Sequence, residues 1–152
     1  METRRKGVPV NLQVFNLHKH LPIRRKEIKT LVENVCGEID LILKNCSIIF
    51  CDDHTLRNMH ETYLQNPAFT DVMTFNLGTK DIEGEIYVSI DRVRENAEHY
   101  NASFKEEIYR NIIHGLLHLK GYDDKRAVER RRMKKVENQL LRQASVAWLE
   151  TK

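Results

Sequence analysis

The sequence has no long hydrophobic run. After the basic start Met-Glu-Thr-Arg-Arg-Lys, the stretch from Val8 to Leu17 is interrupted by Asn11, Gln13 and Asn16. A membrane-spanning helix needs about 20 largely apolar residues, and a signal peptide needs an apolar core of its own. We therefore expect neither a signal peptide nor a membrane partner.

The sequence is also short of cysteine and has no internal repeat. Its three cysteines, Cys36, Cys46 and Cys51, are an odd number in apolar or strand-like surroundings. This favours reduced, buried thiols in a cytoplasmic protein over disulfides or a Cys-ligated metal. The 152 residues fit a single domain (1–152), and the formal net charge of +3 permits an acidic partner without requiring one.

Hydrophobic periodicity predicts four strands and five helices. The strands are expected at 10–14, 46–51, 70–75 and 85–90. The helices are expected from Pro22 to a stop at Gly37, after Asp52 or Asp53, after a cap at Asp91, from a capping box at Ser103 and Glu106, and over about 126–144. This order predicts an α+β fold in which a mixed four-stranded sheet is packed with about five helices.

One segment carries the clearest chemical signal. His114 and His118 are four residues apart, so a helix places both imidazoles on one face. Gly121 follows where a helix commonly ends in a left-handed residue, and the chain can then return Asp124 beneath the histidines. Two imidazoles and one carboxylate leave a fourth position for water, which is typical of an open, zincin-like metal site.

The spacing of the two histidines and the glycine is that of known zinc peptidases, but the chain lacks their catalytic glutamate. The zinc peptidases with this spacing have a glutamate directly after the first histidine, as general base, and this chain has Gly115. The pattern therefore indicates hydrolysis of something other than a peptide. An iron oxygenase with a two-histidine, one-carboxylate set is a further alternative, but the helical spacing fits zinc hydrolases better.

Other polar residues lie on the helix that is predicted to carry His114 and His118. Glu107 and Arg110 lie on the same face as the histidines, where they form either a surface ion pair or part of the site. Lys120 and Arg110 could offset charge on a phosphate. The basic run 130–135 is either a solvated helix face, the commoner case, or an RNA-binding patch.

Residues 114–124 resemble the strongest signature of the YbeY family of bacterial metallo-endoribonucleases, H-G-x-L-H-L-x-G-Y-D-H. The segment from Tyr63 to Phe75 resembles a second family block, Y-R-x-x-x-x-P-T-D-V-L-S-F, and Gly84-Glu85-Ile86 resembles a third. The resemblance implies a zinc-dependent endoribonuclease, with one zinc ion or another divalent transition metal held by His114, His118 and Asp124. It also implies that Thr70 and Asp71 lie near the substrate.

The chain departs from the family pattern at two positions. Asp124 stands where the family has its third metal histidine, and a carboxylate is an ordinary zinc ligand. Leu64 stands where the family has an arginine that is thought to serve RNA handling. We expect Arg110, one turn before His114, to supply the missing cation, and we expect either Glu107 or metal-bound hydroxide to act as the base.

The resemblance implies a role in ribosomal RNA processing. The expected activity is single-strand-specific cleavage in late maturation of the 3′ end of small-subunit ribosomal RNA and in ribosome quality control. The expected partners are ribosomal RNA and the small ribosomal subunit, with ribosomal proteins and an assembly GTPase as further candidates. The alternatives are a non-catalytic ribosome-assembly or RNA-binding factor with a structural metal, and a zinc peptidase-like hydrolase.

Overall fold

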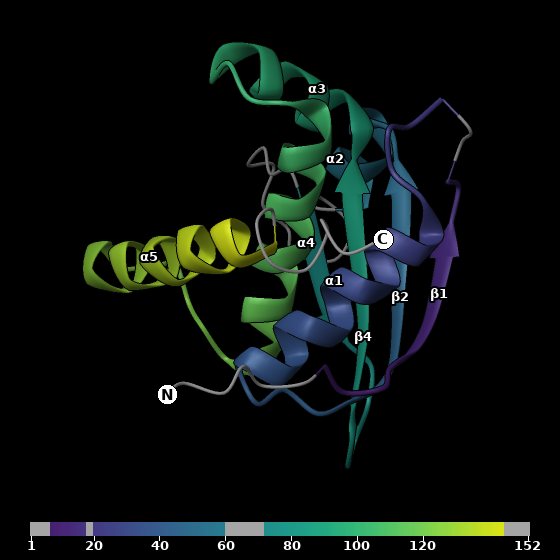
Figure 1. The fold of residues 1–152 in the computed structure, drawn as a ribbon, viewed down its shortest axis with the longest axis vertical. Helices are drawn as coiled ribbons and strands as arrows, with labels where there is room; N and C mark the ends of the chain where they lie inside the picture. Colours follow the sequence, from purple (N-terminus) through teal and green to yellow (C-terminus); the bar gives the residue numbers. More distant parts are fainter. Residues whose placement is uncertain (1–6, 18–19, 60–71, 145–152) are drawn as a thin grey trace.

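The structure, a computed structural model, describes residues 7–17, 20–59 and 72–144 (Figure 1). In these ranges it confirms the predicted α+β fold and the predicted order of four strands and five helices. The elements are β1 (Asn11–Phe15), α1 (Arg25–Glu38), β2 (Leu43–Cys51), α2 (Asp53–Met59), β3 (Val72–Asn76), β4 (Ile82–Ser89), α3 (Ile90–His99), α4 (Phe104–Lys120) and α5 (Ala127–Gln143).

The four strands form one mixed sheet in the order β1-β2-β4-β3. Strands β1, β2 and β4 are parallel, and β3 pairs antiparallel with β4 at the edge of the sheet. Strand β2 is therefore enclosed between two parallel neighbours. Its Cys46, Ile48 and Phe50 are buried on the face that carries the core, as strand alternation requires.

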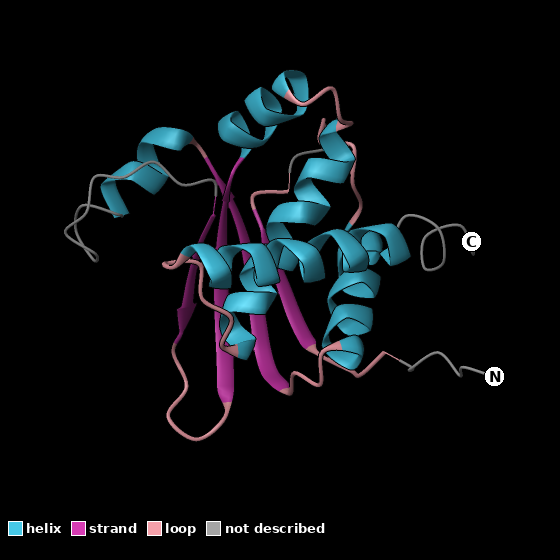
Figure 2. Cartoon of the chain, turned by 90° about the vertical axis from the view of Figure 1, so that its left-hand side faces the viewer, coloured by secondary structure: helices cyan, strands magenta, loops and turns pink. Residues whose placement is uncertain are grey.

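Helix α4 is the central element of the helical layer. Together with α1 it covers one face of the sheet, and α5 crosses it on the side away from α1 (Figures 1 and 2). Ile108, Ile112, Leu116 and Leu117 of α4 are almost completely buried in the core cluster. The apolar face of α4 is therefore buried in the core, which gives the two histidines a rigid support.

Several predicted element boundaries were wrong. Helix α1 begins at Arg25, three residues after Pro22, and it continues through Gly37 to Glu38. The N-cap of α3 is Ser89, whose hydroxyl accepts a hydrogen bond from the Arg92 amide at 3.3 Å, so Asp91 lies inside the first turn. Ser89 is both the last residue of β4 and the N-cap of α3. The sequence does not reveal the second role, because a strand residue and an N-cap residue both have extended backbone.

The thiols are buried and unpaired, as the sequence predicted. Cys36 and Cys46 are buried and Cys51 is half-buried, and all three are free of disulfides. Burial raises the pKa of Cys36 and of Cys46 to about 12, so both remain protonated at neutral pH. In the part of the chain that the structure describes, no helix is long and apolar enough to cross a membrane.

Candidate metal centre

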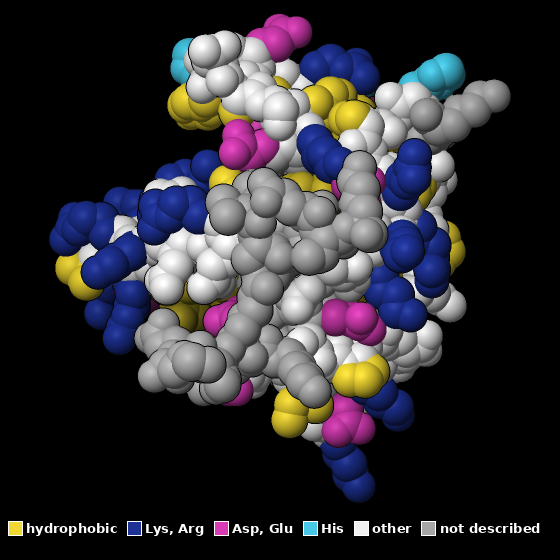
Figure 3. Space-filling model, viewed as in Figure 1, with side chains coloured by type: hydrophobic (Ala, Val, Ile, Leu, Met, Phe, Trp, Pro, Cys, Tyr) yellow, Lys and Arg dark blue, Asp and Glu magenta, His cyan; other side chains and the backbone are white. Residues whose placement is uncertain are grey.

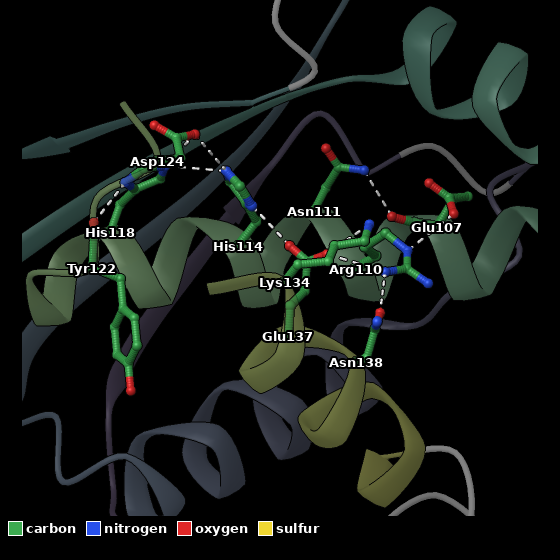
Figure 4. A network of polar contacts seen from close by, with 10 residues as sticks. All are labelled: Glu107, Arg110, Asn111, His114, His118, Tyr122, Asp124, Lys134, Glu137 and Asn138. Atoms are coloured by element: carbon green, nitrogen blue, oxygen red, sulfur yellow. Dashed lines mark hydrogen bonds and ion pairs between the residues drawn. The ribbon is translucent and has the colours of Figure 1, made fainter. Parts of the chain in front are cut away.

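Helix α4 holds His114 and His118 side by side. The helix begins at Ser103, whose hydroxyl accepts a hydrogen bond from the Glu106 amide at 3.0 Å, which confirms one half of the predicted capping box. One turn separates the two histidines, and their Nε2 atoms lie 3.1 Å apart. The apolar face of α4 thus fixes both imidazoles at one point on its half-exposed side (Figure 4).

The turn after α4 brings Asp124 to the same point. Gly121 ends the helix in the left-handed region, with φ at 116°, and its amide donates to the carbonyls of Leu117 and His118. The Asp123 carboxylate then accepts from the Asp124 amide at 2.7 Å and from the Lys125 amide at 3.2 Å. These bonds fold the chain back so that Asp124 Oδ2 lies 3.6 Å from each histidine Nε2.

The spacing of these three ligand atoms suits a metal ion. Ligands about 2.0–2.1 Å from a zinc ion stand about 3.3–3.4 Å apart in a tetrahedron. The observed separations of 3.1, 3.6 and 3.6 Å are close to that value. His114, His118 and Asp124 form a cluster in which one ligand atom of each lies within 4.8 Å of the others.

The hydrogen bonds of the imidazoles support the same conclusion. His114 Nδ1 donates to Glu137 Oε1 at 2.7 Å, and His118 Nδ1 donates to the Tyr122 carbonyl at 3.1 Å, because both partners can only accept. Each neutral ring then has an unprotonated Nε2. Two unprotonated nitrogens 3.1 Å apart repel each other, and a cation bound to both removes the repulsion. The residues therefore fit a metal.

Electrostatics keeps His118 in the form that binds metals. Burial and the neighbouring His114 lower the pKa of His118, against the opposing effects of Asp124 and the Tyr122 carbonyl. Burial acts to raise the pKa of Glu137, but its hydrogen bond with His114, the charge of Lys134 and its hydrogen bond with Arg110 hold this pKa below the ordinary value. Glu137 is thus an ionised carboxylate behind His114, one of the candidate metal ligands.

Glu137 is a residue of the site that the sequence reasoning missed. It lies on α5 and is only 3% exposed, with its carboxylate shared between His114 and the cations Arg110 and Lys134 (Figure 4). The available signal was its position. It follows Met133 by four residues and precedes Leu140 by three, so helical spacing places a carboxylate on the buried face of α5.

Arg110 is held in place by three residues. Its Nε donates to Glu107 Oε1 at 3.3 Å, and its Nη1 donates to Glu137 Oε2 at 3.0 Å and to Asn138 Oδ1 at 2.9 Å. The ion pair with Glu107 that the sequence allowed is therefore present, as part of a larger network. Arg110 Nη2 has no protein acceptor within the described ranges, so one edge of the guanidinium remains available to a ligand.

Glu107 is poorly placed to act as a base. It is 3% exposed, and its carboxylate forms an ion pair with Arg110. Figure 4 places Glu107 and Asp124 at opposite ends of the polar network. The geometry therefore makes Glu107 a partner that orients Arg110.

Gly115, the residue in place of the peptidase base, faces the sheet. A Cβ at this position would lie 2.8 Å from Ile86 Cγ2 on β4. The glycine therefore allows α4 to approach the sheet closely. A glutamate here would point into the core, away from the histidines, so this frame has no room for the peptidase base.

Of the remaining predicted residues, only Lys120 is described, and it is not brought to the cluster. Lys120 lies on the last turn of α4, where its Nζ donates to the Asp40 carbonyl at 2.9 Å, and it does not line the cavity beside His114. Thr70, Asp71 and Leu64 lie outside the described residues.

A cavity of about 290 Å³ opens beside the cluster. Two apolar side chains, Val72 of β3 and Met133 of α5, form part of its wall. The polar lining comes from α4, the turn and α5, and consists of Glu107, Arg110, Asn111, His114, Asp124, Arg130, Lys134 and Glu137. An anionic ligand in this cavity would meet three cationic side chains and the candidate metal ligands at once.

The helix and the turn after it bring two histidines and a carboxylate together. This arrangement is typical of metal-dependent hydrolases. The family model described as Endoribonuclease YbeY matches residues 13–145. The chain belongs to the endoribonuclease YbeY family.

Individual relatives agree with this assignment. An Endoribonuclease YbeY of Amoebophilus asiaticus is 43% identical over 115 residues, which cover 74% of this chain and 78% of the relative. One of Bacteroides thetaiotaomicron is 36% identical over 120 residues, covering 78% and 88%. A protein of Thermotoga maritima, solved in solution, has a TM-score of 0.59 and 26% identity over 90% of this chain and 91% of its own.

Proposed function

We propose that this protein is a metal-dependent endoribonuclease that hydrolyses phosphodiester bonds in single-stranded ribosomal RNA. The observation that carries the proposal is the convergence of His114, His118 and Asp124 beside a cation-lined cavity. The family assignment adds the class of reaction, because the curated relatives are endoribonucleases.

One zinc ion is the cofactor that fits these ligands best. Two imidazoles and a carboxylate suit zinc, and His114 has the carboxylate partner on its other nitrogen that metal-binding histidines usually have. A divalent ion held there would supply a Lewis acid that polarises a phosphoryl oxygen and lowers the pKa of water.

The surrounding side chains prepare the site for a phosphate. Glu137 and the Tyr122 carbonyl fix the tautomer and orientation of the two imidazoles. Arg110 neutralises Glu107 and Glu137 and lines the same cavity, where its guanidinium can donate to a phosphate oxygen. Arg110 thus combines the positioning role with a contact to the substrate.

We further propose a place for this reaction in the cell. The substrate is the 3′ end of small-subunit ribosomal RNA late in maturation, and the same activity serves ribosome quality control. The partners are then the small ribosomal subunit, ribosomal proteins and an assembly GTPase, in the cytoplasm. Single strands are preferred because a phosphodiester must enter a cavity of about 290 Å³ to reach the ligand cluster, which a rigid duplex hinders.

The direct test is cleavage of ribosomal RNA fragments by the purified protein, with and without a chelator, followed by mapping of new ends. We expect new ends in single-stranded regions that disappear with the chelator and return with added zinc. RNA that is bound but uncut under all metal conditions would favour the assembly-factor alternative. Equal cutting of duplex and single strand would contradict the substrate preference.

A further inference from the structure

The positive charge of the chain is concentrated on α5. The helix contains six cationic residues and two carboxylates, a net charge of +4, whereas the whole chain has a formal net charge of +3. The other 135 residues together are therefore close to neutral, at −1. Figure 3 shows the result as a gathering of Lys and Arg side chains over α5.

These cations are placed where they oppose folding of the helix. Arg130 lies at the end of the first turn of α5, close to the positive end of the helix dipole. Arg131 and Lys135 form a like-charge pair four residues apart, which destabilises a helix by about 0.2–0.5 kcal/mol. Carboxylates at some of these positions would stabilise the helix more than the cations do.

Few of the cationic side chains on α5 form ion pairs with carboxylates of the described residues. Within the described ranges, Arg131, Arg132 and Lys135 are exposed and have no carboxylate within ion-pair distance. One of the two carboxylates of α5, Glu137, is buried and already shared by His114 and Arg110. The charge on this face is consequently available to an external polyanion.

The cationic face begins at the candidate metal centre. Arg130 and Lys134 line the cavity that contains His114 and Asp124, and Arg130 Nη1 also donates to the Asp124 carbonyl at 3.3 Å. The next helical positions outward are Arg131 and Lys135, four residues apart on one face. A chain of phosphates that enters the cavity would therefore continue directly onto exposed cations.

We propose that the outer face of α5, formed by Arg131, Lys134 and Lys135, binds the backbone of single-stranded RNA next to the nucleotide held in the cavity. This inference rests on the proposed function, because it takes the RNA to be the substrate. The face is unsuited to a membrane, since Met133, Leu140 and Leu141 are buried in the core and the exposed side has only Val128 as a large apolar residue.

The test compares two double charge reversals with the same change in net charge. Arg131→Glu with Lys135→Glu alters the proposed face, and Lys44→Glu with Lys80→Glu alters exposed lysines on β2 and in the turn before β4. Binding of fluorescent polyuridine is measured by anisotropy in chelating buffer over a series of salt concentrations. Chelation separates binding from cleavage, and melting temperatures confirm that each variant is folded.

We expect the α5 variant to bind polyuridine at least about tenfold more weakly at low salt and to lose about 1.4 from the slope of log K against log salt, since each contact to a single strand contributes about 0.7. The control variant should lose much less. Arg131→Gln with Lys135→Gln, which is less disruptive, should show an intermediate loss.

Unchanged binding by the α5 variant, or equal losses in both reversals, would overturn the inference. So would a parent protein that does not bind polyuridine. If the parent cuts ribosomal RNA and the α5 variant binds normally, only this inference fails. If the parent cuts no RNA but the α5 variant loses binding, the nuclease proposal fails and the binding face stands.

Discussion

At the scale of single residues, Glu137 has the largest influence on the candidate metal centre apart from the ligands. It accepts from His114 Nδ1 at 2.7 Å and so selects the tautomer whose Nε2 faces the other ligands. We predict that Glu137→Gln weakens zinc affinity by about 10–100-fold, as loss of such partners usually does. Competition with a chromophoric chelator measures this, with Glu129→Gln on the exposed side of α5 as control. Equal affinity in the two variants would refute the role.

Arg110 links two buried carboxylates, so its loss should first be seen in stability. Glu107 and Glu137 are almost completely buried, and Arg110 pairs with both. We predict that Arg110→Ala lowers the free energy of unfolding by about 2–4 kcal/mol, because two buried charges lose their cation. Arg110→Lys should restore only part, since an ammonium cannot bridge both groups in the same way. Urea denaturation measures the loss, and an Arg110→Ala variant as stable as the parent would contradict it.

Gly115 provides a test of the contact between α4 and the sheet. Alanine is the better helix former by about 1 kcal/mol, yet its Cβ would lie 2.8 Å from the fully buried Ile86. We predict that Gly115→Ala lowers the free energy of unfolding by about 1–3 kcal/mol, as overpacking typically does. Thermal and urea unfolding measure it. A more stable Gly115→Ala variant would show that the helix does not need this close approach.

The three candidate metal ligands could be predicted from the sequence more readily than Glu137. The spacing of His114, His118, Gly121 and Asp124 is a local pattern, and the backbone geometry of a helix end is enough to bring the three ligands together. Glu137 meets His114 only through the packing of α5 on α4, which is a tertiary contact. Its partners could therefore not be predicted from periodicity, although its place on the buried face of α5 could.

At the scale of elements, an ion-pair cluster joins α1 to α4. Glu27 of α1 accepts a hydrogen bond from Tyr109 Oη at 2.9 Å and pairs with Lys105. Burial acts to raise the pKa of Glu27, but Lys105, Tyr109 and the Arg24 amide outweigh it and hold the pKa below its ordinary value of 4.5. A carboxylate with a lowered pKa stabilises the fold above its unfolded pKa, and this contribution is lost as the pH falls through the folded pKa.

We therefore predict that Glu27→Gln is less stable than the parent at neutral pH. The difference should shrink as the pH falls below about 4.5, where the carboxylate of the unfolded chain becomes protonated, and it should vanish below the lower pKa of the folded state. Melting curves across this range measure the effect, with Glu98→Gln on the exposed side of α3 as control. A difference that stays constant with pH would mean that the charge of Glu27 does not stabilise the contact.

Element types were more predictable than element ends. The 3.6-residue periodicity of α4 and the alternation of β2 extend over many residues, so single exceptions do not change the prediction. The start of α3 depends on one hydroxyl, that of Ser89. The N-cap of α1 is Arg24, which is not one of the usual capping residues. Such ends are decided by tertiary packing, which the local sequence does not reveal.

At the scale of the whole molecule, the order of the strands positions the site. Strand β3 follows β2 in sequence but lies beyond β4 at the sheet edge, where Val72 reaches the cavity wall. The sequence predicted a mixed sheet but gave no means of ordering its strands, because pairing depends on contacts between distant segments. The cavity, formed by β3, α4, the turn and α5, was unpredictable for the same reason.

The central claim is that His114, His118 and Asp124 hold one catalytic metal. The most direct measurement is elemental analysis of the purified parent, Asp124→Ala and Asp124→His proteins, each equilibrated with the same free zinc. We predict about one zinc per chain in the parent and in Asp124→His, because an imidazole can replace the carboxylate, and loss or marked weakening in Asp124→Ala. Zinc bound by Asp124→Ala as tightly as by the parent would contradict the account.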